Sequence, residues 1–326
     1  MAEEINLSIC IACYNHELYI KQCLDSVVQY ENNRQVEIVI INDCSTDDSH
    51  NQITQRIEIN QSIKVIYHSN IENRWPGYTY NQAYKYSSGQ YISFMDSDDY
   101  FTGSSLQHKI QLLEQDDQSM MVYGNGSFLM DRKILKSSLH TSIEKLLFKH
   151  NPWLLYQAIT EKIPLLSLSA SVIRRELLDK IGWFDESRFS LNDRVLNIKM
   201  MQYLMKYKLW FLYNETKVFA YRIHNNNISK NPQNQYECFD YIIHTYCPSQ
   251  NYLSLMREIT FVTAIRYKVL GNTQGAYKYY RYLLTYTWWY IQKVICYVIL
   301  HIPSSIIEKL YLSFRKLKHH VKWTIF

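Results

Sequence analysis

Glycine and proline are scarce in this chain of 326 residues, which contains only 8 glycines and 6 prolines but 29 tyrosines. This composition argues against long flexible linkers and low-complexity tails. No G-x-G-x-x-G pattern follows the first apolar run, which argues against a dinucleotide-binding loop. The formal net charge of +5 is too small to indicate a nucleic-acid partner, so we expect none. A hydrophobic fraction of 47% instead indicates a globular chain, long enough for one large domain or two modest ones.

Seven cysteines are scattered along the chain, and only Cys10 and Cys13 form a C-x-x-C pair. This pair lies in an apolar run, and no second pair has the spacing of a zinc site. We therefore expect both side chains to be buried as small hydrophobic groups. The odd count, together with the lack of a recognisable signal peptide, favours reduced thiols in the cytoplasm.

Three carboxylates close the stretch from Gly89 to Asp99, in which an apolar run ends in the sequence D-S-D-D. The run indicates a buried strand, so Asp96, Asp98 and Asp99 would lie at its carboxyl end, where open α/β sheets bind ligands. Such close carboxylates repel one another unless a cation lies among them, and oxygen ligands suit a divalent cation that also holds phosphate. The alternative is a polar turn in which Asp99 caps the next helix, which explains one aspartate of the three.

Apolar runs alternate with helical patterns along the first two thirds of the chain. This alternation builds βαβ units, so we expect an α/β fold with a mostly parallel, Rossmann-like sheet and flanking helices. Every acidic turn then falls on one edge of the sheet. The expected strands cover 7–12, 36–41, 64–67, 91–95, 120–123, 166–173, 209–213 and 216–221. The expected helices cover 18–30, 78–86, 103–115 and 174–181, with one more that ends near 60 and one that begins near 193.

From about residue 236 onward the chain is helical in pattern and rich in aromatic residues. The segment 283–302 is about long enough to span a bilayer, although Lys293 near its centre would cost roughly 2.5–3.5 kcal/mol. The segment 306–326 places apolar residues among lysines and arginines, which suits a helix lying in an anionic membrane interface. We therefore expect a membrane-associated C-terminal region, and whether it spans the membrane or lies on it stays open. The alternative is a soluble helical domain with a basic face.

Six short motifs follow one another along the chain. They are Ser8–Asn15 with Glu17, Val39–Asp47, Gly89–Asp99 with its D-S-D-D, Ile181–Glu186, Asn192–Asp193, and Tyr221–His224 followed by Asn227–Ser229. In this order they resemble the family 2 glycosyltransferases of the GT-A fold, in particular the non-processive enzymes of bacterial surface-polysaccharide synthesis. The resemblance covers about residues 5–230. It implies a GT-A catalytic domain over 1–235, with a nucleotide-binding half at about 1–125 and an acceptor half at about 126–235, and then the helical region 236–326.

The resemblance assigns the nucleotide-binding residues. It implies that Ala12, Tyr14 and Glu17 line the pocket for the base, and that Asp43 accepts a hydrogen bond from the uracil N3–H. An ionised carboxylate only accepts hydrogen bonds, which suits that role. Asp96 would contact the ribose or a metal-bound water. The alternative for Asp43 is a cap on the next helix.

The resemblance also assigns the metal ligands and the base. Asp98 would bind Mn²⁺ or Mg²⁺, and His224 would complete the metal shell or touch the diphosphate, with a structural histidine as the alternative. Asp193 falls where the family keeps its general base, with a helix N-cap as the alternative. Three positions depart from the family pattern: Asn192 stands where many members have glutamate, Asn42 where many have an acid, and Cys44 where many have glycine.

An enzyme of this kind would be an inverting hexosyl- or N-acetylhexosaminyltransferase, because one direct displacement converts an α-linked donor into a β-linked product. The Q-x-x-R-W signature of processive synthases is absent, which indicates transfer of a single sugar. We expect a nucleotide-sugar donor, foremost a UDP-sugar, and a lipid-linked or saccharide acceptor at the cytoplasmic face of the inner membrane. The alternatives are a non-catalytic nucleotide-sugar-binding or scaffold protein and a nucleotidyltransferase. The latter would need a glycine-rich, basic loop after the first strand, and none is present there.

Overall fold

The structure is a computed structural model of the chain. It describes residues 5–31, 35–59, 63–103, 106–130, 133–136, 138–140, 145, 152–160, 167–186, 192–225, 227–247 and 252–286. The described residues form two compact units: those of 1–157 and 164–225 make up the first, and those of 158–163 and 226–326 make up the second. The predicted domain ranges, which describe functional parts of the chain, stay a prediction.

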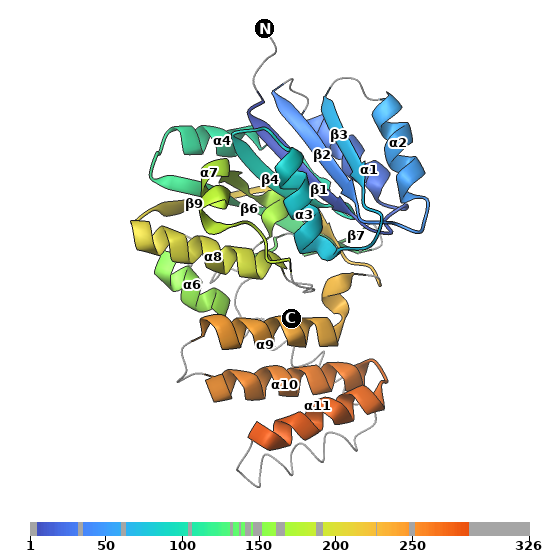
Figure 1. The fold of residues 1–326 in the computed structure, drawn as a ribbon, viewed down its shortest axis with the longest axis vertical. Helices are drawn as coiled ribbons and strands as arrows, with labels where there is room; N and C mark the ends of the chain where they lie inside the picture. Colours follow the sequence, from blue (N-terminus) through green and yellow to red (C-terminus); the bar gives the residue numbers. More distant parts are fainter. Residues whose placement is uncertain are drawn as a thin grey trace. The chain divides into compact units, whose positions relative to one another are not determined.

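The first unit contains one mixed sheet of nine strands among its described residues (Figure 1). The strands are β1 (Leu7–Cys13), β2 (Val36–Asn42), β3 (Lys64–Ser69), β4 (Tyr91–Asp96), β5 (Tyr100–Phe101), β6 (Ser119–Met130), β7 (Lys133–Lys136), β8 (Val172–Arg174) and β9 (Trp210–Arg222). Their order is β3-β2-β1-β4-β8-β6-β9-β5, and β7 pairs with β6. The pairs among β3, β2, β1 and β4 are parallel, as is β6 with β9, whereas β8 runs antiparallel to both of its neighbours. The predicted α/β fold is confirmed, with a parallel N-terminal half and a mixed remainder.

Helices flank this sheet and make up the second unit (Figure 1). Up to residue 225 the described helices are α1 (Ile20–Tyr30), α2 (Ser49–Ile59), α3 (Trp75–Tyr86), α4 (Gln107–Glu114), α6 (Pro152–Thr160), η1 (Leu168–Ala170), α7 (Arg175–Ile181) and α8 (Asn192–Tyr207). Beyond it they are η2 (Ile228–Lys230), α9 (Pro232–Tyr246), α10 (Tyr252–Val269) and α11 (Thr273–Tyr286). The region after residue 236 is therefore helical as far as it is described, as predicted.

The main core lies on one face of the parallel strands. Side chains at alternate positions of β1, such as Ile9 and Ile11, share a hydrophobic cluster with Ile20 and Leu24 of α1. On the other face, α3 packs against β1 and β2, and its Tyr80 ring meets Phe94 of β4 edge-on at 5.3 Å. Because helices cover both faces, these strands are continuous apolar runs, which is why they could be predicted from the sequence.

Two predicted strands have a different form in the structure. The stretch predicted as one strand over 166–173 is a short helix, η1, followed by the short strand β8. Ser167 explains the difference, because its side chain accepts a hydrogen bond from the Ser169 N–H and so favours a turn over a strand ladder.

The segments 209–213 and 216–221, predicted as separate strands, form the single strand β9. The pairing of β6 with β9 is irregular between the pairs Tyr123↔Tyr213 and Asn125↔Lys217. Asn125 Nδ2 donates to the Glu215 carbonyl at 3.3 Å within this irregularity. Asn214 and Glu215, which separate the two predicted strands, therefore lie at an irregularity within one continuous strand.

The predicted burial of the C-x-x-C pair is confirmed. Cys10 and Cys13 are free and fully buried. Burial raises the pKa of the Cys10 thiol to about 12 and that of the Cys13 thiol to about 11. Both are therefore apolar packing groups rather than metal ligands.

Among the helices that the structure describes, none is both long enough and apolar enough to cross a membrane. The predicted membrane association rests on 283–302 and 306–326, and residues 287–326 lie outside the described part of the chain. It stays a prediction.

Candidate active site

The carboxyl ends of β1, β2 and β4 form one edge of the sheet. Because these strands are parallel and adjacent, Cys13 pairs with Asn42 and Ala12 pairs with Asp96. The Asp43 N–H continues the pattern and donates to the Cys13 carbonyl at 2.7 Å. The turns that leave these three strands, which carry the first three motifs, therefore converge.

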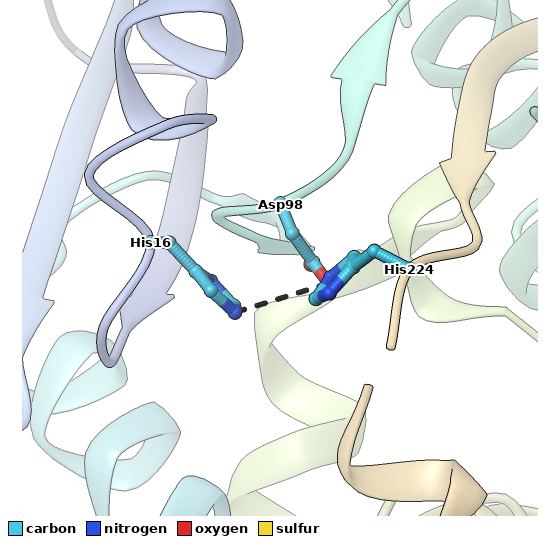
Figure 2. A group of neighbouring side chains, drawn as sticks. All are labelled: His16, Asp98 and His224. Atoms are coloured by element: carbon cyan, nitrogen blue, oxygen red, sulfur yellow. Dashed lines mark hydrogen bonds and ion pairs between the residues drawn. The ribbon is translucent and has the colours of Figure 1, made fainter. Parts of the chain in front are cut away.

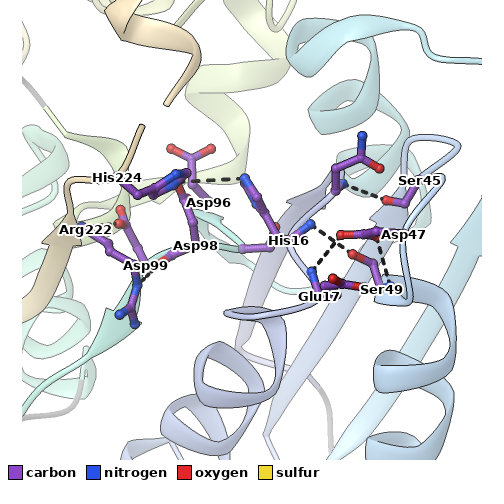
Figure 3. Close-up of polar contacts among 12 residues, drawn as sticks. His16, Glu17, Ser45, Asp47, Ser49, Asp96, Asp98, Asp99, Arg222 and His224 are labelled. Carbon is purple, nitrogen blue, oxygen red and sulfur yellow. Dashed lines mark hydrogen bonds and ion pairs between the residues drawn. The ribbon is translucent and has the colours of Figure 1, made fainter. Parts of the chain in front are cut away.

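Hydrogen bonds connect the turn after β1 to the turn after β2 (Figure 3). The His16 N–H donates to Ser49 Oγ at 2.9 Å, and the Glu17 N–H donates to Asp47 Oδ2 at 3.0 Å. In return, Glu17 Oε2 accepts the Asp48 N–H at 2.7 Å. Glu17, predicted to line the base pocket, thus joins two loops at the start of α2, and its carboxylate already has a backbone partner.

Asp43 is buried at the end of β2. Its Oδ1 accepts hydrogen bonds from Asn70 Nδ2 at 2.7 Å and from the Arg74 N–H at 2.9 Å. These contacts tie β2 to the loop before α3, so Asp43 does not act as a cap of α2. Tyr14 is 43% exposed and Ala12 is half-buried at the same edge. The structure therefore brings together the residues predicted for the base pocket.

Cys44, which stands where many family members have glycine, has a φ of +62°. This left-handed conformation costs a residue with a Cβ roughly 1–2 kcal/mol, whereas glycine adopts it freely. The departure from the family pattern therefore leaves the turn geometry in place, at the expense of some backbone strain.

The three aspartates after β4 have different partners. Tyr80 donates its hydroxyl hydrogen to Asp96 Oδ1 at 2.5 Å. Asp99 is buried, and its Oδ1 accepts the Arg222 N–H from β9 at 2.8 Å, while Oδ2 has no hydrogen-bond partner. Asp99 therefore joins β4 to β9 and does not cap a helix, which was the alternative interpretation.

The third aspartate, Asp98, faces two histidines (Figure 2). Its Oδ2 lies 2.8 Å from His224 Nε2 and 3.9 Å from His16 Nε2. The two imidazole rings meet edge-on with their centres 5.9 Å apart. The other ring nitrogen of His16, Nδ1, lies 2.7 Å from Ser97 Oγ. Residues that follow β1, β4 and β9 thus meet at one point.

The pKa values of the three carboxyl groups shift in different directions. Burial alone would raise the pKa of Asp98, but the hydrogen bond from His224 and the nearby His16 hold it below its ordinary value. Surrounding protein atoms and the Asp98 charge raise the pKa of Asp96 to about 7, although Asp96 is partly open to solvent. Burial and the same neighbouring charges raise the pKa of Asp99 well above its ordinary value. Burial lowers the pKa of His16, against the opposing effect of Asp98, so its ring favours the neutral form.

Two overlapping sets of described residues could hold a metal ion. One is His16, Asp98 and His224, and the other is Asp96, Asp98 and Asp99; in each set the ligand atoms lie within 4.8 Å of one another. Both sets contain Asp98, the residue predicted to bind the metal, and the first also contains the predicted His224. The donors fit a divalent cation, since carboxylate oxygens and neutral imidazole nitrogens both bind Mn²⁺.

Asp193 lies in the first turn of α8 and is half-buried. Its Oδ1 accepts the Arg194 N–H at 2.8 Å. Burial raises the pKa of Asp193, against the positive charge and the N–H of Arg194. The charge of Asp193 in turn contributes to the raised pKa of Asp96 and of Tyr123, so Asp193 lies within electrostatic reach of the aspartates after β4.

Sequence reasoning did not single out His16 or Arg222. Arg222 Nε donates to the Asp98 carbonyl at 2.8 Å, and its guanidinium carbon lies 4.9 Å from the ring centre of Tyr19. His16 lies between Asn15 and Glu17 of the first motif, and Arg222 lies within the motif Tyr221–His224. A polar side chain in the turn that follows a buried strand was the available signal for His16, because the sheet edge is where ligands bind.

Comparison with known proteins identifies the family. The sequence profile described as "Glycosyl transferase family 2" matches residues 8–182. An uncharacterised glycosyltransferase of Rickettsia typhi is 26% identical over 249 residues, which cover 72% of this chain and 69% of the relative. A poly(ribitol-phosphate) beta-glucosyltransferase of Bacillus spizizenii is 34% identical over 134 residues, 41% of this chain but only 21% of that protein.

Solved structures share the fold. TarS 1–349 of S. aureus, in complex with UDP-GlcNAc, has a TM-score of 0.56 and 18% identity, covering 81% of this chain and 72% of that chain. The mannosyltransferase PcManGT of Pyrobaculum calidifontis, in complex with GDP-Man and Mn²⁺, has a TM-score of 0.56 and 13% identity, covering 98% of this chain and 88% of that chain. The match to the profile spans more than half of the sequence, and the fold agrees with it. The chain belongs to glycosyl transferase family 2 and is thus a glycosyltransferase of the GT-A fold, as the motifs predicted.

Proposed function

We propose that the chain is an inverting, metal-dependent glycosyltransferase that moves one sugar from a UDP-sugar to a lipid-linked or surface-polysaccharide acceptor. The observation that carries the proposal is that two parts lie at one sheet edge and that a third lies within electrostatic reach of them. These are the buried Asp43, the Asp98–His224 pair, and Asp193 within electrostatic reach of Asp96. Asp43 would bind the base of the nucleotide, the Asp98–His224 pair would hold the cation of the diphosphate, and Asp193 would accept the proton of the acceptor hydroxyl.

Asp43 supports a nucleotide site. Among the hydrogen bonds of the described residues, Asn70 and Arg74 both bind Oδ1, which leaves Oδ2 for a base N–H such as uracil N3–H. The neighbouring Tyr14 offers an exposed aromatic face for the base. The TarS complexes with UDP and UDP-GlcNAc favour a UDP-sugar, and the GDP-Man complex of PcManGT makes a GDP-sugar the second candidate.

Asp98 and His224 would hold the cation. Mn²⁺ or Mg²⁺ bound there would offset the negative charge of the departing nucleoside diphosphate. Asp96, held by Tyr80, would contact the ribose or a water on the cation. The Mn²⁺ in PcManGT supports this assignment.

Asp193 would act as the general base. In its ionised form it would take the proton of the acceptor hydroxyl while that oxygen bonds to the anomeric carbon and the diphosphate leaves from the opposite side. A single displacement inverts the anomeric centre, so an α-linked donor gives a β-linked product. The Bacillus relative is by name a poly(ribitol-phosphate) beta-glucosyltransferase, which supports this outcome and a polymeric acceptor.

The C-terminal segment would bring the enzyme to its acceptor. Its aromatic and basic sequence over 283–326 supports a peripheral position on the cytoplasmic face of the inner membrane. A lipid-linked acceptor would then be held at the surface where the catalytic domain works.

Nucleoside diphosphate binding tests the donor site. The full chain would be titrated with UDP, GDP and dTDP, each with Mn²⁺ or with EDTA, and heat release would be measured. We expect UDP to bind most tightly, and only with Mn²⁺. Asp43→Asn should weaken UDP binding by roughly tenfold to a hundredfold, because it removes a hydrogen bond to a charged acceptor. The exposed Asp117→Asn is the matched control. Failure of the chain to bind any nucleoside diphosphate under either condition would contradict the proposal.

A further inference from the structure

His16 is held in place from both ends. Its backbone N–H donates to Ser49 Oγ at 2.9 Å, and its Nδ1 lies 2.7 Å from the oxygen of Ser97, a fully buried residue. One ring nitrogen is therefore engaged by the protein, and Nε2 is the nitrogen that faces Asp98 (Figure 2). Histidines that bind metals are commonly oriented in this way, with the second nitrogen bound to a neighbouring protein group.

Each carboxylate beside Asp98 has one oxygen bound within the protein. Asp96 Oδ1 accepts the Tyr80 hydroxyl at 2.5 Å, and Asp99 Oδ1 accepts the Arg222 N–H at 2.8 Å. Asp98 instead points its Oδ2 at both histidines. Because Asp98 directs one oxygen at both imidazoles, we favour the set with two imidazoles and one carboxylate.

We propose that His16 is a ligand of the catalytic cation, so that this chain binds its metal through His16, Asp98 and His224. The inference rests on the proposed function, since the same cation would hold the donor diphosphate. It goes further because it gives the metal site two nitrogen donors, His16 and His224, which are far apart in the sequence.

The donor set determines which cation the site prefers. Mg²⁺ and Ca²⁺ are hard cations that favour all-oxygen ligands, whereas imidazole suits transition metals such as Mn²⁺ and Co²⁺. A site with two histidines and one aspartate therefore favours Mn²⁺ and Co²⁺ over Mg²⁺. A site made by the three aspartates would accept Mg²⁺ readily.

Metal binding can be measured directly on the full chain, with and without UDP. Electron paramagnetic resonance reports free Mn²⁺, and the visible spectrum of Co²⁺ reports its ligands. Excess Mg²⁺ in the Mn²⁺ titration gives the cation preference. We expect His16→Ala to weaken Mn²⁺ binding by about tenfold or more, since loss of even an outer partner costs roughly 10–100-fold. His16→Gln, which offers an oxygen, should move the preference toward Mg²⁺.

Two further variants complete the design. Ser97→Ala leaves His16 in place but frees its ring, so Mn²⁺ binding should weaken less than in His16→Ala. His108→Ala removes an exposed histidine of α4 and should bind Mn²⁺ like the unchanged chain. Thermal unfolding without metal checks that each variant folds.

Unchanged Mn²⁺ affinity, Co²⁺ spectrum and cation preference in a folded His16→Ala variant would overturn the assignment of His16. That result is distinct from failure of the proposed function, in which the unchanged chain itself would bind no nucleoside diphosphate and hydrolyse no nucleotide-sugar. Even then the Co²⁺ spectrum of the metal-loaded chain would report whether His16 is a ligand.

Discussion

At the scale of single residues, the raised pKa of Asp193 lowers the stability of the folded protein and favours the role of Asp193 as a general base. Burial raises its pKa, which means that the folded protein stabilises the ionised carboxylate less well than water does. A general base benefits from a pKa nearer to the working pH, since it is then a stronger proton acceptor. The same raised pKa lowers the stability of the folded state at neutral pH.

Replacement of Asp193 by asparagine should separate these two effects. We expect the transfer rate of Asp193→Asn to fall by roughly 10²–10⁴-fold, because the proton acceptor is lost, while UDP affinity stays the same. The variant should also unfold at a higher temperature at neutral pH, because it removes a buried charge. Steady-state transfer, UDP titration and thermal unfolding check the three outcomes, with Asp117→Asn as control. A variant that keeps its transfer rate would show that another group is the base.

Asp96 should give the metal-free protein a pH-dependent stability. Its pKa in the folded chain is raised to about 7, so its contribution to stability is complete at acidic pH and is lost as the pH rises through about 7. The ionised form is the one that a cation binds. Added Mn²⁺ should therefore raise the unfolding temperature more above pH 7 than below it.

Asp96→Asn provides the comparison for this pH dependence. In this variant the metal-free stability should fall less as the pH rises from about 4 to about 7. An identical pH profile in the two proteins would contradict the assignment of this titration to Asp96.

Which site residues could be predicted depends on how local their contacts are. Asp96, Asp98 and Asp99 stand together in the sequence, and a strand before them places them at the sheet edge. His16 contacts Ser97, 81 positions later, and His224 contacts Asp98, 126 positions earlier. Only the family resemblance pointed to His224, and no local pattern could show that His16 faces the same carboxylate.

At the scale of elements, one buried carboxylate joins the first three strands. Glu37 of β2 accepts hydrogen bonds from Ser8 Oγ of β1 at 2.8 Å, from Lys64 Nζ of β3 at 2.7 Å and from Ser88 Oγ, before β4, at 2.9 Å. Burial raises the pKa of Glu37, but the bonds from Lys64, Ser88 and Ser8 outweigh it and lower the pKa below the ordinary value. Glu37 thus connects neighbouring strands of the sheet whose carboxyl ends carry the candidate site.

Loss of this carboxylate should destabilise the sheet. We expect Glu37→Ala to lower the free energy of unfolding by about 3 kcal/mol, because several buried donors lose their acceptor. Lys64 is 52% exposed, so Lys64→Ala should cost only about 1 kcal/mol or less. Urea unfolding at neutral pH measures both. Since the folded pKa of Glu37 is lowered, its contribution is lost as the pH falls through that lowered value, and the difference between Glu37→Ala and the unchanged chain should shrink there.

The elements that could be predicted are those whose local pattern agrees with their environment. β1, β2 and β4 are apolar runs buried on both faces, and their sequence alone indicates them. β9 was divided in two because Asn214 and Glu215 resemble a turn, and only its pairing with β6 keeps the strand continuous. The antiparallel insertion of β8 between β4 and β6 depends on contacts far apart in the chain, so no local pattern reveals it.

At the scale of the whole molecule, the candidate site lies in the first unit, and the basic C-terminal segment follows the second unit's described helices in the sequence. The full chain should sediment with vesicles that contain anionic lipid and should be released by salt. Replacing Arg315, Lys316 and Lys318 with glutamine should weaken this binding on the order of 100-fold, at about 1 kcal/mol for each charge.

A matched variant tests whether position matters in that binding. Glutamine at the exposed Lys133, Lys180 and Lys206 removes the same charge from the first unit and should leave vesicle binding nearly unchanged. Equal loss in both triple variants would indicate a general charge effect and not a C-terminal membrane contact.

Hydrolysis of donor tests the central claim most directly, because it requires no knowledge of the acceptor. The full chain would be incubated with UDP-, GDP- and dTDP-sugars, each with Mn²⁺ or with EDTA, and the released nucleoside diphosphate would be measured. A metal-dependent glycosyltransferase should release one nucleoside diphosphate, foremost UDP, only with Mn²⁺, and Asp98→Asn should abolish the release. Equal release with EDTA would contradict the role of the metal, and no release from any donor would contradict the enzyme itself.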